Sequence, residues 1–553
     1  MGGYSARGTY AKAWQVEPDL TRGELARPQA HRLLALTVSQ SITRVARRTV
    51  MIQPPYPGTT PVTPPPGPPA PPAPPGNSPP APPVSPPPTP PVVPAPTRPL
   101  LRSSRTIQGN VLAAFNKDHQ AFRMVTLPAD PARARAWLAG LLGQISVTED
   151  VEDWNEAFSE ARRDNGGIEP DMHVVWVGLT LTAAGLEVLA QDPGRVSTDL
   201  AEMPALTVGP AARAATLGDV GPSDPTKWLF GASGQPSIHA VVTVAADIAE
   251  HLAERELLLD AHDAAHGVST AYRQNGDTLP GDRAGHEHFG FKDGISQPGV
   301  TDFHPTDAHG DRDGHPGTTM APAANFVFGQ DSNPQVPAWL RDGSAHVLRR
   351  LEQDVQAWRT QLNTLAATVT SPTGPLTPDR LGELMMGRAK DGTPLATPTD
   401  PARGLGTDGN DFDYATDPAG KVTPCAAHIR KTHPRSFFPN PRMMRRGIPF
   451  GAPFDTDPTG KRGLVFNCFV TSIEGQFEFI QQSWANNPGF PAGTITGPDP
   501  VIGSDGQFNL ALTEGTHCTL PVARSVVTAG AVYGLALSIP TLRALATSGQ
   551  LPT

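Results

Sequence analysis

Hydrophobic positions become regular near residue 105 and predict a folded domain of strands and helices. Residues 121–127, 173–181 and 239–247 are short, nearly continuous apolar runs, which are typical of buried strands. Residues 131–145, 182–190 and 248–262 space their apolar side chains three or four positions apart, which predicts helices with one apolar face. This order of elements predicts an α+β domain in which helices cover one face of an antiparallel sheet.

The second half of the chain shows the same two patterns. Residues 345–366 predict one long amphipathic helix, with an apolar stripe formed by Leu348, Leu351, Val355, Trp358 and Leu362. Residues 463–473 alternate in polarity and predict a core strand. Residues 515–539 predict further strands, and residues 541–547 predict a short closing helix.

The first hundred residues are not expected to form a packed core. Proline occupies about every second position between residues 54 and 99. Because proline removes backbone donors and favours extended polyproline II, we expect a semi-rigid spacer there. Residues 1–52 are polar and net basic, so we expect a disordered leader, although residues 31–50 would also suit a short basic amphipathic helix formed on a partner.

Length, charge and cysteine content narrow the class of protein. A chain of 553 residues exceeds one ordinary core and predicts two domains, and its net charge of −9 gives no support for nucleic-acid binding. Three cysteines without a CxxC pair indicate reduced thiols rather than a disulfide framework. Because the sequence shows neither a membrane-spanning apolar run nor the apolar core of a secretory signal in residues 1–30, we expect a cytoplasmic protein.

Candidate chemistry is densest in residues 425–454, CAAHIRKTHPRSFFPNPRMMRRGIPFGAPF. His428 is followed by cations that alternate with apolar residues: Arg430, Lys431, Arg435, Arg442, Arg445 and Arg446. This mixture suits a partly buried anionic ligand with a large apolar body, and haem has these properties. The alternative for a lone histidine beside arginines is a surface or core residue without a ligand.

A second stretch, GHEHFGFKDGISQPGV at residues 285–300, holds Asp293 between glycines in an apolar loop. The glycines permit tight turns and close approach of the backbone to a flat ligand. The alternative for Asp293 alone is an Asx turn. His286 and His288 form an HxH pair, but because no acidic or thiol partner stands at ligand spacing, we expect solvated loop histidines rather than a metal site.

Four motifs in order connect these stretches: FGFKDGISQP, CAAHIRKTHPR, MRRGIPFG and GLVFNCFVTSIEGQFEFIQQSW, supported by IQGNVLAAFNKDHQAF and PDPVIG. From about residue 107 to the C-terminus the chain resembles the dye-decolorizing (DyP-type) haem peroxidases. The resemblance implies two ferredoxin-like α+β domains of the dimeric α+β barrel type. We expect an N-terminal domain at 101–305 that ends in the GxxDG loop, and a haem-binding domain at 306–553 with an insertion at about 306–417.

On one side of the cofactor, haem b, the resemblance implies His428 as the axial iron ligand, with His433 as the rival. Asp499 of PDPVIG is the candidate acceptor for the other ring nitrogen of the ligand, because ligating histidines usually donate that proton. Cys425 would offer a thiolate instead, but the family uses histidine. For the haem propionates, which need cations, Arg435 is the first choice and Arg430 the second.

On the peroxide side, the resemblance implies Asp293 as the acid–base group and Arg445 as the arginine that stabilises developing negative charge. Arg446 is the neighbouring alternative to Arg445. Leu464 and Phe466 match the apolar residues that narrow this side of the pocket.

The implied activity is oxidation of phenolic or dye-like aromatic donors by hydrogen peroxide. Bulky donors would react at the haem edge or through Trp358, Trp484 or Tyr414, although core packing is the default role for each of these side chains. One alternative is a haem-binding or haem-trafficking protein on the same fold. Another is a cargo protein that the proline-rich arm attaches to a protein partner or shell.

Overall fold

The computed structural model describes residues 100–553 apart from 331–335, 372–373, 407, 436–440 and 514–515. The predictions for the leader and spacer therefore lie outside the described residues. Within the described part, no helix combines the length and apolarity needed to cross a membrane.

The first half of the described chain has ferredoxin-like topology. Its strands are β1 (His119–Thr126), β2 (Val175–Leu181), β3 (Ala240–Ala246) and β4 (Ser269–Asp277), all antiparallel and ordered β2-β3-β1-β4. Helices α3 (Pro131–Leu141) and α4 (Thr148–Asp164) follow β1, and α8 (Ala249–His266) follows β3. The strands and helices predicted here are confirmed, whereas α4 and β4 were not predicted. α4 is rich in charged residues and buries only Thr148, Val151 and Glu152, so it lacks the apolar stripe that marks the other helices.

The second half repeats the same strand order. Its strands are β7 (Ser344–Gln353), β10 (Met444–Arg445), β11 (Ile448–Phe450), β12 (Gly463–Val470) and β15 (Val526–Ala536). They are ordered β15-β7-β12, with β10 and β11 both pairing with β12. Helix α9 (Val355–Ala366) follows β7, and two π-helical turns at Ile473–Glu478 and Ile480–Ala485 follow β12. Two α+β halves of ferredoxin-like order confirm the predicted fold class.

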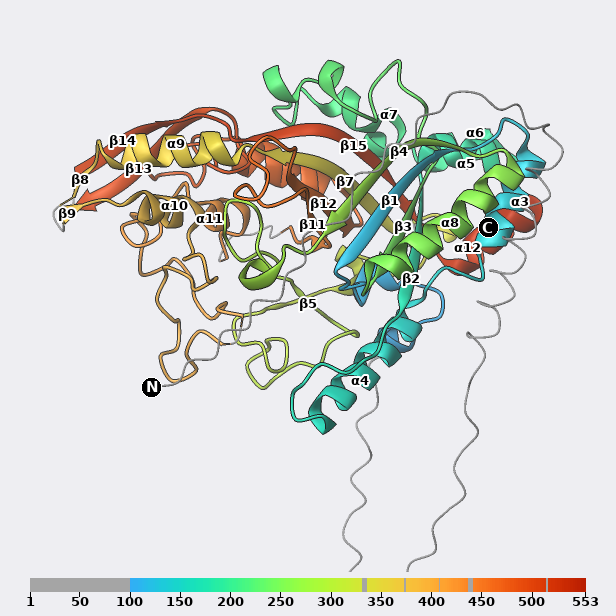
Figure 1. The fold of residues 1–553 in the computed structure, drawn as a ribbon, viewed down its shortest axis with the longest axis horizontal. Helices are drawn as coiled ribbons and strands as arrows, with labels where there is room; N and C mark the ends of the chain where they lie inside the picture. Colours follow the sequence, from blue (N-terminus) through green and yellow to red (C-terminus); the bar gives the residue numbers. More distant parts are fainter. Residues whose placement is uncertain (1–99, 331–335, 372–373, 407, 436–440, 514–515) are drawn as a thin grey trace, which may run out of the picture. The chain divides into compact units, whose positions relative to one another are not determined.

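One sheet runs through both halves and its two ends approach each other (Figure 1). The halves join where Leu535 of β15 pairs with Leu181 of β2. At the other end, Gly276 of β4 meets β11 so closely that a Cβ at this position would lie 2.5 Å from Ile448 Cγ2 and 2.9 Å from Pro449 O. Glycine is therefore required at this closure, which turns the sheet into a barrel.

Helices and short elements complete the fold (Figure 1). Leu542 of α12 and Trp137 of α3 pack in the same buried cluster as Val242 of β3. The remaining helices are α2 (Gly109–Leu112), α5 (Ala183–Leu189), α6 (Pro193–Asp199), α7 (Pro204–Arg213), α10 (Pro378–Met386), α11 (His428–Thr432) and α12 (Ile539–Ser548). The remaining strands are β5 (Gly299–Val300), β6 (Met320–Ala321), β8 (Thr370–Ser371), β9 (Gly374–Pro375), β13 (Gly506–Thr513) and β14 (Thr516–Val522).

The predicted single helix at 345–366 is wrong in its first half. The strand β7 ends at Gln353, and Asp354 then caps α9 by accepting a hydrogen bond from Ala357 N at 2.8 Å. β7 is buried on both faces, so Val347 and Leu348 enter two different core clusters. A strand of this kind lacks alternation, and its apolar residues can match helical spacing.

The position of β7 also corrects the expected insertion. β7 and α9 lie inside the interval 306–417, yet they are the first strand and first helix of the second ferredoxin-like half. This interval therefore supplies part of the sheet rather than a separate insertion. The predicted boundary near residue 305 stays a prediction.

Candidate active site

A cavity of about 800 Å³ lies against the sheet of the second half. Strand β12 supplies part of its wall: Leu464 and Phe466 face the cavity, while Val465 between them is buried in the core. This arrangement follows from the two-residue period of a strand. On β7, Leu351 and Arg349 pair with Leu464 and Phe466 and also line the cavity. The volume is within the range of cofactor and ligand sites.

His428 begins helix α11 and lines the same cavity. Its Nδ1 lies 2.8 Å from Asp499 Oδ2, and Asp499 is fully buried. The other carboxylate oxygen, Oδ1, accepts hydrogen bonds from Val501 N at 2.8 Å and Ile502 N at 3.0 Å. Since these donors fix the carboxylate as an acceptor, Nδ1 of His428 carries the proton and Nε2 is left to bind a ligand.

The charge on Asp499 also governs the protonation of His428. Burial lowers the pKa of His428, but the negative charge and hydrogen bond of Asp499 outweigh burial and raise the pKa overall. Arg445 and Asp293 shift the same pKa more weakly, in opposite directions. The three predicted groups thus share one cavity and affect one another electrostatically.

Asp293 lies at the base of a small hairpin formed by the 285–294 loop. Its backbone N–H donates to Gly285 O at 2.9 Å, and Glu287 N donates to Phe291 O at 3.0 Å. Gly290 and Gly294 both adopt positive φ, 96° and 76°, so the turns on either side of Asp293 require glycine. Asp293 is exposed and lines the cavity, and its Oδ1 accepts a hydrogen bond from Gly294 N at 2.6 Å.

Arg445 on β10 is fixed at both backbone and side chain. Its N–H donates to Gln297 Oε1 at 3.2 Å, its carbonyl accepts from Gln297 Nε2 at 3.0 Å, and its Nη2 donates to Ser296 O at 3.1 Å. Burial lowers the pKa of Arg445, and the negative charge of Asp293 opposes this shift. A guanidinium is therefore held in the same cavity as the aspartate.

The neighbouring Arg446 has a different role. Its guanidinium donates to the carbonyls of Asn110, Val111 and Leu112 in α2, at distances of 2.8 to 3.3 Å. Burial, together with the charge of Arg445, lowers the pKa of Arg446 to about 9. Arg446 therefore connects β10 to α2, which leaves Arg445 as the arginine available for chemistry.

Cations gather at one end of the cavity. Arg435 donates to Asn410 O at 2.6 Å, and its guanidinium carbon lies 3.6 Å from the centre of the Phe412 ring. Its buried Nε has no hydrogen-bond partner among the described residues. Arg442 donates to Thr319 Oγ1 at 2.6 Å. Within the described residues, neither arginine forms an ion pair with a carboxylate, so this end is suited to an anion.

His433, the rival to His428, also lines the cavity but stands beside Arg442 Nη1 at 3.2 Å. Burial and the neighbouring arginines, first Arg442, hold the pKa of His433 well below its ordinary value. Its Nδ1 faces the guanidinium, whereas Nδ1 of His428 has a carboxylate acceptor. A ligating histidine usually has such an acceptor, so the geometry favours His428.

Arg430 does not line the cavity, contrary to the expectation that it binds the ligand. It donates to Thr423 O at 2.8 Å, pairs with Asp417 at 3.4 Å and stacks on Tyr414. Residues two positions apart on a helix point in different directions, so Arg430 turns away from the surface that His428 presents. Cys425 is buried outside the cavity lining as well, which removes the thiolate alternative.

Comparison with family models and with known proteins shows which family has this arrangement of residues. Residues 106–280 match the family model described as the DyP dimeric alpha+beta barrel domain, and residues 377–490 match the one described as Dyp-type peroxidase, C-terminal. Peroxidase 2 of Mycetinis scorodonius is 33% identical over 433 residues, which cover 73% of this chain and 77% of that protein. The chain belongs to the dye-decolorizing (DyP-type) peroxidase family. It is therefore an oxidoreductase that acts on peroxide.

Two further relatives support the membership. A multifunctional dye peroxidase of an Amycolatopsis species is 30% identical over 482 residues, which cover 79% of this chain and 95% of that protein. A solved structure of a dye-decolorizing peroxidase in complex with 2,6-dimethoxyphenol superposes with a TM-score of 0.64 at 27% identity, covering 80% of this chain and 98% of that chain.

Peroxidases of the DyP family are haem enzymes, and the cavity residues of this member fit that cofactor. In the part of the chain that the structure describes, Nε2 of His428 and the buried Nε of Arg435 have no hydrogen-bond partner, and apolar side chains line the wall. An anionic edge of the cofactor is matched by the cationic end of the cavity.

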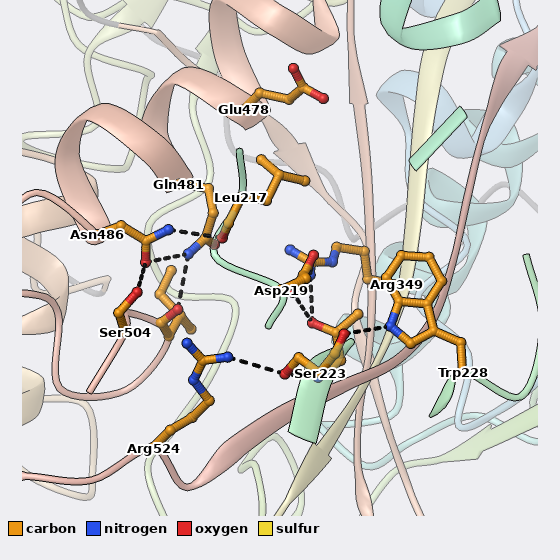
Figure 2. A network of polar contacts seen from close by, with 12 residues as sticks. Leu217, Asp219, Ser223, Trp228, Arg349, Glu478, Gln481, Asn486, Ser504 and Arg524 are labelled. Carbon is orange, nitrogen blue, oxygen red and sulfur yellow. Dashed lines mark hydrogen bonds and ion pairs between the residues drawn. The ribbon is translucent and has the colours of Figure 1, made fainter. Parts of the chain in front are cut away.

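A second group of polar residues also lines the DyP-type cavity (Figure 2). There Arg349 Nη2 pairs with Asp219 at 2.5 Å, and Asp219 also accepts from Thr528 Oγ1 at 2.7 Å. Arg524 donates to Ser223 Oγ at 3.2 Å, and Asn486 holds the adjoining loop through Leu217 O. Arg349 is thus paired with a carboxylate, whereas Arg435 has no carboxylate partner among the described residues, so Arg435 is the better match for a propionate of these two.

Three aromatic side chains considered as electron relays are buried. Trp358 and Trp484 stack on Phe289 and Phe490, with ring centres 4.7 Å and 5.2 Å apart. Tyr414 packs beneath Arg430. Core packing, the default role, therefore accounts for each of them. His288 is also buried and faces Phe450 O through Nε2 at 2.9 Å, so the expectation of a solvated loop histidine is wrong there.

Glu287 is a functional candidate that sequence reasoning missed. Its carboxylate accepts hydrogen bonds from Phe291 N at 2.9 Å, from Phe289 N at 2.8 Å and from Gln353 Nε2. These contacts shape the tip of the hairpin that presents Asp293, and Glu287 lines the cavity itself. Its partners are mainly backbone N–H groups, which the sequence pattern does not reveal.

Glu287 makes stability depend on pH. Burial raises its pKa from 4.5 to about 7 against the effect of its N–H donors, and the charge of Asp293 adds to the rise. The protonated carboxyl is thus favoured in the folded state, so its stabilisation is full below about pH 4.5 and is lost as the pH rises to about 7. Glu287→Gln lacks this titrating group and is the reference. The difference in unfolding free energy, wild type minus Glu287→Gln, should fall by up to roughly 3 kcal/mol across this window.

Guanidinium titrations of both proteins at a series of pH values measure this difference. Asp282→Asn, in the exposed turn just before the hairpin, is the matched control and should show no such slope. A difference that stays flat or increases with pH would mean that the N–H donors outweigh burial.

Proposed function

We propose that this DyP-type peroxidase binds haem b and oxidises phenolic and dye-like donors with hydrogen peroxide. The observation that carries the proposal is the His428–Asp499 pair, which opens onto a cavity that also holds Asp293 and Arg445. The substrate class is supported by the relatives, one named a multifunctional dye peroxidase and one solved with 2,6-dimethoxyphenol.

His428 Nε2 is the proposed iron ligand. Asp499 accepts the Nδ1 proton of His428, which orients the ring and makes the imidazole more electron-donating. When bound, haem b supplies an iron centre that peroxide oxidises and that aromatic donors then reduce. Arg435 is the proposed partner of the propionates, with Arg442 beside it.

Asp293 is the proposed proton carrier for peroxide. Its carboxylate would take the proton from one peroxide oxygen and return it to the other, which leaves as water. The guanidinium of Arg445 would stabilise the negative charge that develops between these proton transfers. Leu464 and Phe466 keep this space narrow and apolar, so a peroxide molecule fits and a dye would be oxidised at the cofactor edge.

A cytoplasmic location remains a proposal. It is supported by the three cysteines, which are all free thiols in the described structure. Cell fractionation tests it, and recovery only from a secreted fraction would contradict it. The proposed attachment of the proline-rich arm to a partner is tested by comparing co-purified proteins with and without residues 1–100.

Asp293→Asn and Arg445→Leu separate peroxidase chemistry from haem binding. We expect each variant to keep wild-type haem content, because neither residue is a proposed haem ligand, and to lose activity by about 100-fold or more. Steady-state oxidation of 2,6-dimethoxyphenol and haem absorbance measure the two properties. Asp282→Asn should retain activity. Full turnover in both active-site variants would refute the roles of Asp293 and Arg445 and would favour a haem-binding protein without catalysis at these groups.

Arg435→Leu and Arg430→Leu test where the propionates bind. A charge-assisted hydrogen bond contributes about 1.5 to 3 kcal/mol, so we expect Arg435→Leu to raise the haem dissociation constant by about 10-fold or more. Arg430→Leu should leave haem affinity unchanged, because Arg430 faces Asp417 and Tyr414 instead. Transfer of haem to excess apomyoglobin measures both, and Arg435→Lys should recover part of the loss. An equal loss of haem affinity in Arg435→Leu and Arg430→Leu would contradict the placement of the propionates at Arg435.

A further inference from the structure

Lys431 is an unusual residue in the wall behind His428. It lies on α11 three positions after His428 and is fully buried. Its Nζ donates to Asn487 O at 2.7 Å and Phe490 O at 2.6 Å and lies 5.6 Å from the centre of the Phe490 ring. Within the described residues, no carboxylate forms an ion pair with it. A buried ammonium normally requires a compensating anion, so its presence here needs an explanation.

One part of the explanation is mechanical. Asn487 and Phe490 belong to the segment that directly follows the second π-helical turn, and the last residue of that turn, Ala485, accepts a hydrogen bond from Asp499 N at 2.7 Å. Lys431 and Asp499 are thus anchored to the same stretch of chain, one from α11 and one from the 499–502 turn. Neutral amide donors would make equivalent bonds to the two carbonyls, so this anchoring does not require a positive charge.

The nearby buried anion is Asp499, which is anchored to the same stretch of chain as Lys431 and is as fully buried. Burial lowers the pKa of Lys431 to about 8, and the negative charge of Asp499 opposes this shift. The effect is mutual, since a positive charge in a poorly screened interior stabilises the ionised carboxylate in turn.

We propose that Lys431 is a positioning residue whose positive charge acts on Asp499 and limits how strongly Asp499 draws the Nδ1 proton of His428. The inference rests on the proposed ligation of haem iron by His428. A weaker pull on this proton makes the imidazole less electron-donating. The charge of Lys431 therefore keeps the ferric/ferrous potential less negative, and the enzyme retains oxidising power toward donors that release electrons reluctantly.

Two substitutions separate the charge of Lys431 from its hydrogen bonds. Lys431→Gln removes the charge and keeps N–H donors for the two carbonyls, whereas Lys431→Arg keeps both. In the haem-loaded full chain, we expect Lys431→Gln to shift the ferric/ferrous midpoint potential to more negative values and Lys431→Arg to stay near wild type. Spectroelectrochemical titration measures the shift. Lys461→Gln, which removes an exposed lysine paired with Glu352, is the control for loss of one positive charge and should leave the potential unchanged.

The decisive test is whether the effect of Lys431 on the potential depends on Asp499. In an Asp499→Asn background the carboxylate is absent, so Lys431→Gln should shift the potential much less than it does in wild type. Lys431→Met loses the hydrogen-bond donors as well as the charge, and it provides a second neutral variant if the glutamine protein does not fold. In the wild-type background, Lys431→Met should shift the potential in the same direction as Lys431→Gln.

Three results would overturn the inference: an unchanged potential in a neutral variant with normal haem content, an equal shift in Lys431→Arg, or a shift that persists fully without Asp499. A failure of the proposed function gives a distinct result. If His428 is not the iron ligand, His428→Ala leaves the iron coordination unchanged, whichever residue occupies position 431.

Discussion

The hydrogen bond between His428 and Asp499 is the interaction on which the site depends. Asp499 is fully buried, and its carboxylate is held by Val501 N and Ile502 N as well as by the imidazole. A buried carboxylate with three N–H donors is a fixed acceptor, so it sets both the tautomer and the direction of His428. The short helix α11 alone would not orient a ligand, because a single turn is marginally stable.

The barrel supplies the surfaces that this imidazole faces. Alternation along β12 sends Leu464 and Phe466 into the cavity, while pairing of β10 with β12 places Arg445 nearby. Asp293 comes from a separate hairpin whose tip is shaped by Glu287. Among the described residues of the cavity wall, Arg435 and Arg442 have no carboxylate partner, whereas Arg349 pairs with Asp219.

Local patterns in the sequence were sufficient for the α+β class and for the strands β1, β2, β3, β12 and β15, because apolar runs and helical spacing are local properties. They failed at β7, whose burial on both faces hides the strand period, and at Arg430, whose direction depends on how α11 is seated. The resemblance to DyP-type peroxidases, rather than spacing, brought together residues as distant as His428 and Asp499. Neither source indicated Glu287, and Lys431 was only one of several cations in its stretch, since the roles of both arise from burial and from contacts with backbone atoms.

The most direct test of iron ligation by His428 is the absorption spectrum of the haem-loaded protein before and after His428→Ala. We expect wild type to show a Soret band with high-spin ferric features, as for iron bound by one imidazole. In His428→Ala these features should be lost and then restored by added imidazole, while His433→Ala should keep the wild-type spectrum. A wild-type protein without porphyrin absorbance, or a His428→Ala protein with unchanged iron ligation, would contradict the account.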